Sequence, residues 1–202
     1  MGREVALLDR PTLCRALETM LDYAALASVA VEYRLIGTAA ALLHGVTLPA
    51  GDVDILLKRR EDVDAFSAAL SRCTCLVAPV WLPGSHQYFA RYDVDGVEVE
   101  FSTVEWETTS DLSEAVGPGP WRHYVELCCG RHTVPTVALE LRLLTELLRD
   151  RADRYRPLSA HLAAHGYDLD LVRRGLAAMD LSADRREAVL RGLAAPTGGA
   201  TP

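Results

Sequence analysis

The fold is decided by two neighbouring stretches, LIGTAAALLHG at residues 35–45 and GDVDILL at residues 51–57. The first stretch predicts a short strand that ends at Gly37 and opens, through Thr38, into a short helix. The start of such a helix presents free backbone N–H groups next to the Thr38 hydroxyl, so this corner is a ready site for phosphate. Gly37 has no side chain and lets the backbone approach a ligand closely.

Two acids open the second stretch, where a strand is expected. Asp52 and Asp54 are two residues apart, so both side chains leave the same face, while Val53, Ile55 and Leu57 point into a core. Two carboxylates so close together repel each other. A divalent cation removes that repulsion, and carboxylate oxygens are the ligands that magnesium prefers. The alternative to a metal site is that these residues form an ordinary surface turn before a strand.

A third carboxylate is expected from a neighbouring strand. Asp95-Gly96 is a strong hairpin signal, and residues 97–103 alternate strictly, with Glu98 and Glu100 on one face. Three acids from two adjacent strands could hold two magnesium ions, which would activate an attacking hydroxyl and stabilise leaving pyrophosphate. Alternation by itself also permits both glutamates to be solvent-facing residues of an edge strand.

Hydrophobic periodicity divides the chain into a mixed α/β segment at residues 1–134, a helical segment at residues 135–195 and a disordered tail at residues 196–202. In the first segment we expect helices at 11–31, 39–44 and 60–70, strands at 33–36, 53–57, 76–82, 87–94 and 97–103, a loop at 104–122 and a hairpin within 124–134. In the second we expect an apolar helix from residue 138 and shorter helices at 157–165, 168–178 and 183–194. The predicted class is α+β: a mixed β-sheet with flanking helices, then a small C-terminal helical bundle.

These motifs resemble the nucleotidyltransferase superfamily, which has the fold of DNA polymerase beta and includes CCA-adding enzymes and antibiotic nucleotidyltransferases. The family commonly has Gly-Ser at the corner, and Gly37-Thr38 keeps the hydroxyl. Its third acid is commonly Asp, and Glu100 matches that position better than Glu98, counted from the hairpin glycine. The resemblance implies that Gly37 and Thr38 hold a triphosphate and that the two aspartates and Glu100 ligate metal, with Glu98 as the substitute or supporting ligand.

The C-terminal part resembles small bacterial members related to antibiotic adenylyltransferases, through VPTVALE at residues 134–140, an apolar helix and a basic run. In such proteins the helical part closes over the triphosphate and contributes basic residues. The matching residues are Arg149, Arg151 and Arg154, which could equally form a solvated helix end. Glu140 could act as a general base across the cleft, or it could be a first-turn acid favoured by the helix dipole.

The resemblance implies an enzyme that transfers a nucleoside monophosphate, AMP from ATP as the first expectation, to a hydroxyl or amine of a small-molecule acceptor. The substrate would be ATP or another nucleoside triphosphate, with magnesium as cofactor and pyrophosphate as product. One alternative is a non-catalytic or repurposed member that binds a nucleotide or a partner. Another is a toxin-type enzyme that acts on protein or tRNA. Trp81, Trp106 and Trp121 could line a substrate pocket or pack in the core and loops.

Composition restricts the possible partners and the location of the protein. The net charge of −7 and the pI of about 5.4 disfavour nucleic acid as the partner and favour a small acceptor, such as a cationic antibiotic or metabolite. No apolar run approaches the roughly 20 residues that span a bilayer, and residues 1–5 lack a signal-peptide pattern, so we expect no membrane partner and a cytoplasmic location. Five cysteines without zinc-site spacing predict reduced thiols. Oligomeric state has no signal in the sequence.

Overall fold

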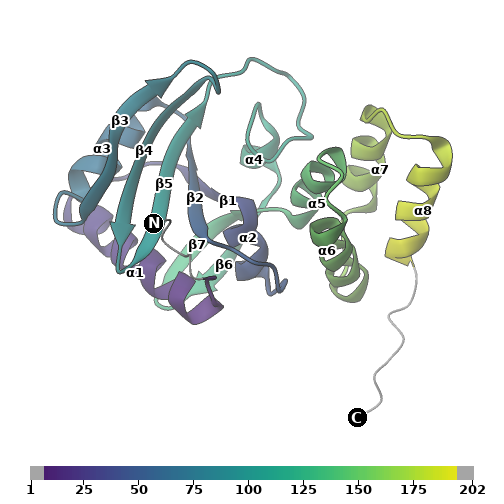
Figure 1. Cartoon of the computed structure of the whole chain (residues 1–202), viewed down its shortest axis with the longest axis horizontal. Coiled ribbons are helices and arrows are strands. Elements are labelled where there is room, and N and C mark those ends of the chain that lie inside the picture. The colour runs from purple at the N-terminus through teal and green to yellow at the C-terminus, as the bar shows by residue number, and fades with distance from the viewer. Residues whose placement is uncertain (1–6, 195–202) are drawn as a thin grey trace, which may run out of the picture.

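The computed structural model describes residues 7–194 and centres on one mixed sheet (Figure 1). The strands are β1 (Tyr33–Ile36), β2 (Asp52–Leu57), β3 (Thr74–Leu82), β4 (Gln87–Val94), β5 (Val97–Val104), β6 (Tyr124–Cys129) and β7 (His132–Val137). They lie in the order β3-β4-β5-β2-β1-β7-β6. β2 pairs with β5 and β1 pairs with β7 in parallel, whereas the other neighbours are antiparallel. The predicted mixed sheet of an α+β fold is therefore confirmed.

Eight helices accompany the sheet within the described residues: α1 (Arg10–Leu26), α2 (Gly37–His44), α3 (Arg60–Ala69), α4 (Gly119–Arg122), α5 (Leu139–Leu148), α6 (Ala152–His165), α7 (Leu169–Ala178) and α8 (Ala183–Ala194). Helices α5 to α8 pack on one another in the green-to-yellow part of Figure 1, and α5 also contacts α2. Residues 139–194 thus form the expected helical segment, and α5 connects it to the sheet. That residues 1–134 and 135–195 are separate domains stays a prediction.

The two faces of the central strands have different roles. Val53 and Ile55 of β2 and Phe101 of β5 are fully buried on the face that α1 and α3 cover. Phe101 stacks on Phe66 of α3, with ring centroids 5.0 Å apart. Because successive side chains alternate, the acids of β2 and β5 are sent to the opposite face. The apolar packing of one face thereby fixes which way the acids point.

Several boundaries differ from those expected. Helix α1 ends at Leu26 rather than near residue 31, and α4 is a single turn inside the predicted 104–122 loop. Helix α6 begins at Ala152 and continues through Pro157, where we expected the helix to start. Proline lacks an N–H and suggests a first turn, yet here it lies one turn in, at the loss of one backbone hydrogen bond. The predicted disordered tail lies outside the described residues.

The cysteines correct one expectation. Cys14 of α1 and Cys129 of β6 form a disulfide with Cα atoms 5.2 Å apart, so the prediction that the thiols are all reduced is wrong. The two residues are 115 positions apart and meet only because α1 packs against β6, which no spacing in the sequence reveals. Cys73, Cys75 and Cys128 are free thiols. Within residues 7–194, no helix has both the length and the apolar character needed to cross a bilayer.

Candidate active site

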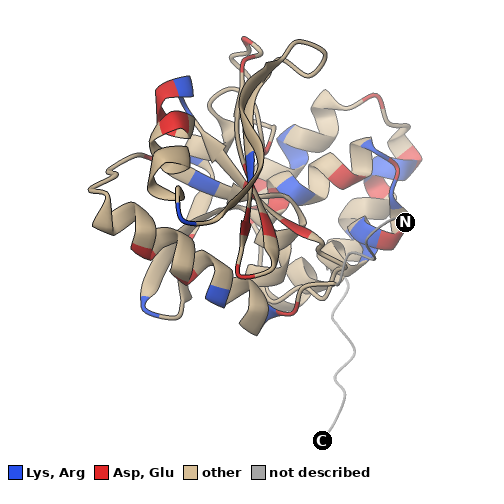
Figure 2. Cartoon of the chain, turned by 60° about the vertical axis from the view of Figure 1, so that its left-hand side comes forward, with Lys and Arg blue, Asp and Glu red and all other residues tan. Residues whose placement is uncertain are grey.

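The site is built on the parallel pairing of β2 with β5. In this register Asp52 lies beside Glu98 and Asp54 lies beside Glu100. Carboxylate oxygens of Asp52, Asp54 and Glu100 all lie within 4.8 Å of one another. Figure 2 shows acidic strand positions gathered near the middle of the molecule, with basic helical positions beside them. The structure thus brings together the three acids that the sequence selected as metal ligands.

Without a bound cation, the carboxylates of this site repel one another. Burial, together with the charges of Asp52 and Glu100, raises the pKa of Asp54 from 3.8 to about 7. Burial also raises the pKa of Glu100, although the Arg91 guanidinium beside it acts in the opposite direction. A divalent cation would offset the repulsion that these shifts report. Three carboxylates with room for water fit magnesium, which keeps several waters and takes one or more carboxylates.

The Gly-Thr corner lies directly against the acids. Gly37 has φ +72°, and a Cβ at this position would clash with Oδ2 of Asp54. Only glycine therefore allows the backbone of α2 to start so near the carboxylates. Thr38 is 8% exposed, and its Oγ1 accepts a hydrogen bond of 2.6 Å from Nη1 of Arg154. Thr38 is thus in direct contact with Arg154, one of the predicted basic residues.

A cavity of about 270 Å³ separates the acids from the helical segment. The lining includes Asp54 and Glu100, the Gly37–Thr38 corner, and the arginines Arg149, Arg151 and Arg154. Acidic and basic side chains therefore line the same space. That arrangement suits a polyphosphate, whose oxygens can bind arginine on one side and a metal ion on the other. Whether the arginines contact phosphate stays a prediction.

A buried ionic network that the sequence analysis missed supports the arginine wall. Arg142 of α5 is 3% exposed and pairs with both Glu114 of the 105–118 loop and Glu146 of α5. Glu146 is fully buried and also lies 3.7 Å from Arg151 and 4.0 Å from Arg149. The Glu146 carboxylate thereby attracts both Arg149 and Arg151, which line the cavity. The available signal was a pair of charges four residues apart, Arg142 and Glu146, inside an otherwise leucine-rich helix.

Two predicted residues lie apart from this cluster. Glu98 is directed to Arg91, with 3.3 Å between Oε2 and Nη1, and it is not part of the group of three metal-competent acids. Glu140 lines a different cavity together with His44, His161 and His165. Its Oε1 accepts a 2.7 Å hydrogen bond from the backbone N–H of Asp168 at the start of α7. The structure therefore does not bring Glu140 to the acids, because the first turn of α5 faces α7 instead.

A Gly-Thr corner before a short helix, a strand with Asp-x-Asp and a parallel neighbour with a third acid define a nucleotidyltransferase fold. A solved structure supports this assignment: a protein from Thermotoga maritima described as a putative nucleotidyltransferase has a TM-score of 0.55 and 19% identity, over 77% of this chain and 96% of that one. An antigenic nucleotidyltransferase-like protein from Paracoccidioides brasiliensis gives a TM-score of 0.49 and 17% identity, over 93% of this chain and 94% of that one. No protein-family model matches the chain, and no curated protein matches its sequence.

Proposed function

We propose that this protein transfers a nucleoside monophosphate, AMP from ATP in the first instance, to a hydroxyl or amine of a small-molecule acceptor and releases pyrophosphate in a magnesium-dependent reaction. One observation carries the proposal: three carboxylates on two parallel strands converge within 4.8 Å, beside a cavity that three arginines also line. Packing alone gives no reason to gather three acids on a half-buried surface, since each repels the others. Binding of a metal-complexed polyphosphate gives that reason.

Each wall of the cavity has a distinct role in this proposal. The backbone N–H groups at the start of α2 and the Thr38 hydroxyl hold phosphate oxygens. Arg149, Arg151 and Arg154 bind the β- and γ-phosphates and so stabilise the charge that develops on pyrophosphate. Asp52, Asp54 and Glu100 would hold the magnesium, two ions as the sequence analysis expects, and bound magnesium would lower the pKa of the acceptor hydroxyl and neutralise phosphate charge.

The bonds that change follow from this placement. The acceptor oxygen forms a bond to the α-phosphorus, and the bond from that phosphorus to the oxygen bridging the α- and β-phosphates breaks. Pyrophosphate leaves with the electron pair of the broken bond. The acceptor proton passes to a carboxylate of the cluster or to solvent. In-line geometry requires the acceptor to approach from the side opposite the arginines, along the β2–β5 surface.

The test compares two glutamates on one strand. Glu100→Gln should lower magnesium-dependent pyrophosphate release by at least about 100-fold, because it removes a ligand of the cation that stabilises the transition state. Glu98→Gln, the matched control two residues away, should lower it far less, since Glu98 lies outside the group of three. Release is measured from ATP, GTP, CTP and UTP with a set of candidate acceptors. Equal losses in the two variants, or full activity of Glu100→Gln, would refute the assignment.

Labelling separates the proposal from its alternatives. ATP labelled at the α-phosphate is incubated with the protein and with three fractions of a cell extract: small molecules, RNA and protein. Label in the small-molecule fraction is the expected result. Label in RNA or protein would instead support a toxin-type activity. Binding of ATP and magnesium without label transfer to any fraction would support a repurposed, non-catalytic protein.

A further inference from the structure

A second cavity adjoins the first along the face of the sheet that carries the acids. It measures about 440 Å³ and is lined by Leu56, Leu57, Lys58, Val104, Thr108, Ala115, Gly117, Pro118 and Trp121. Val104 and Ala115 line both cavities, so the two spaces are direct neighbours. Leu56 lies two residues beyond Asp54 on β2, about 7 Å along the strand. A molecule of ordinary metabolite size in the second cavity can therefore extend to the carboxylates.

The roof of this cavity is a folded loop with little freedom. Gly117 has φ +63°, and a Cβ there would lie 2.7 Å from Cγ2 of Thr108 and 2.8 Å from the Ser110 carbonyl oxygen. The loop thus closes on itself at a position that needs glycine. The middle of the loop is attached to other elements: Oδ2 of Asp111 lies 2.9 Å from Nε2 of His123, and its Oδ1 lies 2.8 Å from Nη1 of Arg174 on α7. The cavity is accordingly a preformed space under a fixed roof.

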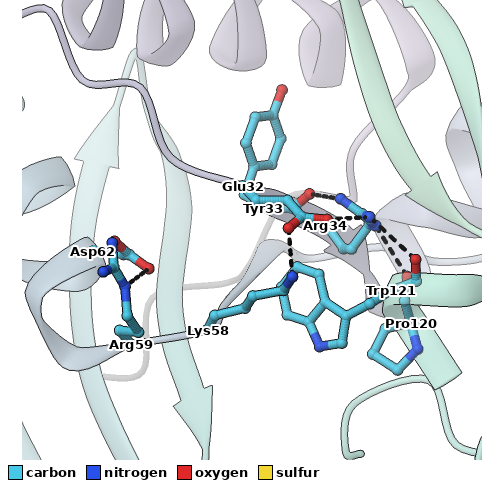
Figure 3. Close-up of polar contacts among 8 residues, drawn as sticks. All are labelled: Glu32, Tyr33, Arg34, Lys58, Arg59, Asp62, Pro120 and Trp121. Atoms are coloured by element: carbon cyan, nitrogen blue, oxygen red, sulfur yellow. Dashed lines mark hydrogen bonds and ion pairs between the residues drawn. The ribbon is translucent and has the colours of Figure 1, made fainter. Parts of the chain in front are cut away.

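A buried arginine, Arg34, contacts the part of the cavity wall that contains Trp121. Nε of Arg34 donates a 2.9 Å hydrogen bond to the Pro120 carbonyl oxygen, and its guanidinium lies 4.9 Å from the Trp121 ring centroid (Figure 3). Nζ of Lys58 also lies close to this indole, 4.6 Å from the ring centroid, and pairs with Glu32. Figure 3 shows Lys58 between Glu32 and the Trp121 indole. The indole and the ammonium group are therefore held together at the edge of the cavity.

The two cavities differ in chemistry. The first is lined by acids and arginines, as a metal-bound polyphosphate requires. Among the described residues that line the second, Lys58 is the only charged one, and the remainder are aliphatic, aromatic, threonine, glycine or proline. Glu32 pairs with both Lys58 and Arg34, so these three residues together carry one net positive charge at the edge of the cavity. A cationic ligand would meet that charge and no carboxylate of the lining. A neutral or anionic ligand with a ring would find apolar walls, an indole and a partner for its charge.

We propose that the second cavity binds the acceptor, and that the acceptor is a ring-bearing hydroxyl compound that is neutral or anionic. This inference rests on the proposed function, because it assigns the nucleotide to the first cavity. It restricts the acceptor to neutral or anionic compounds and excludes the cationic antibiotic or metabolite that the net charge of the protein favoured. The acceptor hydroxyl reaches the acids past Ser102, which lies between Glu100 and Val104 on the cavity-facing side of β5.

The test uses three probes that share one phenol ring and differ in charge: 4-hydroxyphenylacetate, tyrosol and tyramine. Dissociation constants are measured by saturation-transfer NMR, with and without α,β-methylene-ATP and magnesium. The anionic and neutral probes should bind at least about fivefold more tightly than tyramine, the factor expected from one pair of unit charges about 4 Å apart in water. Lys58→Gln should abolish this preference, and Lys58→Glu should reverse it. Arg173→Glu, on an exposed residue of α7 outside both cavities, should leave the preference unchanged.

The outcomes separate this inference from the proposed function. Tyramine binding as tightly as 4-hydroxyphenylacetate, no binding of any probe, or displacement of the probes by the nucleotide analogue would overturn the acceptor assignment. None of these results affects nucleotide binding, which the same titrations report independently. Failure of α,β-methylene-ATP to bind with magnesium would instead count against the proposed function, whatever the probes do.

Discussion

The Asp54→Asn substitution should stabilise the metal-free protein at alkaline pH. Asp54 has an ordinary pKa of 3.8 and a pKa of about 7 in the folded protein. The folded state therefore holds this proton more tightly than the unfolded state does, and stability falls as pH rises from about 4 to about 7. Since a tenfold change in proton affinity corresponds to about 1.4 kcal/mol, the loss is on the order of 4 kcal/mol. Asparagine keeps the shape and removes the charge, so the variant escapes this loss.

Urea unfolding in EDTA at pH 4 to 8 measures the difference. Wild type and Asp54→Asn should have similar free energies of unfolding at pH 4, and the variant should be more stable by several kcal/mol at pH 8. Asp153→Asn is the matched control, since the Asp153 side chain is 72% exposed and its removal should change little at any pH. The comparison isolates Asp54 because the other titrating groups are common to all three proteins.

Magnesium should reverse this order of stability, so that the wild type is more stable than Asp54→Asn. Bound to the three carboxylates, it stabilises the wild type in proportion to the logarithm of its concentration above the dissociation constant, and stabilises Asp54→Asn much less. The same variant should lose nucleotidyl transfer while its fold is kept. The reasoning would be refuted if Asp54→Asn were no more stable than wild type at pH 8 in EDTA, or if magnesium stabilised both proteins equally.

Three further predictions follow from neighbouring contacts. Gly37→Ala should lower the free energy of unfolding by about 1–3 kcal/mol and weaken ATP binding, because its Cβ meets Asp54 and its φ is positive; unchanged urea midpoints and ATP titrations would contradict this. Glu146→Gln should cost about 3–5 kcal/mol and raise the KM for ATP more than it lowers kcat, because it leaves Glu114 as the remaining buried partner of Arg142 and removes the charge that holds Arg149 and Arg151; a variant as stable as wild type would exclude that role. Alkylation of unfolded, unreduced protein should modify three cysteines, and modification of all five would exclude the Cys14–Cys129 disulfide.

Most of the acidic cluster could be predicted from the sequence because it depends on local patterns. Alternation fixes the face of Asp52 and Asp54 relative to the buried Val53, and the Asp95-Gly96 hairpin fixes the face of Glu98 and Glu100. The sequence favours Glu100 over Glu98 only through the resemblance, by the count from the hairpin glycine, and alternation does not distinguish the two. The choice depends on the parallel register of β2 with β5, strands separated along the chain by α3, β3 and β4.

The parts that sequence reasoning missed arise from contacts between distant segments. Glu114 lies in a loop without periodicity, so nothing in its surroundings indicated that it would be buried against Arg142. The second cavity exists only because that loop folds over β2 and β5. The position of Glu140 illustrates the same limit, since its place in the first turn of α5 was clear but the direction of that turn depends on how α7 packs.

The central claim is that Asp52, Asp54 and Glu100 hold the cation that activates a nucleoside triphosphate. The most direct measurement is a crystal structure of the protein with manganese, as a substitute for magnesium, and α,β-methylene-ATP, in which anomalous scattering locates the metal. We predict an anomalous peak about 2 Å from oxygens of all three carboxylates, with phosphates between this peak and Arg154. A nucleotide bound elsewhere, or a metal that contacts none of the three acids, would contradict the account.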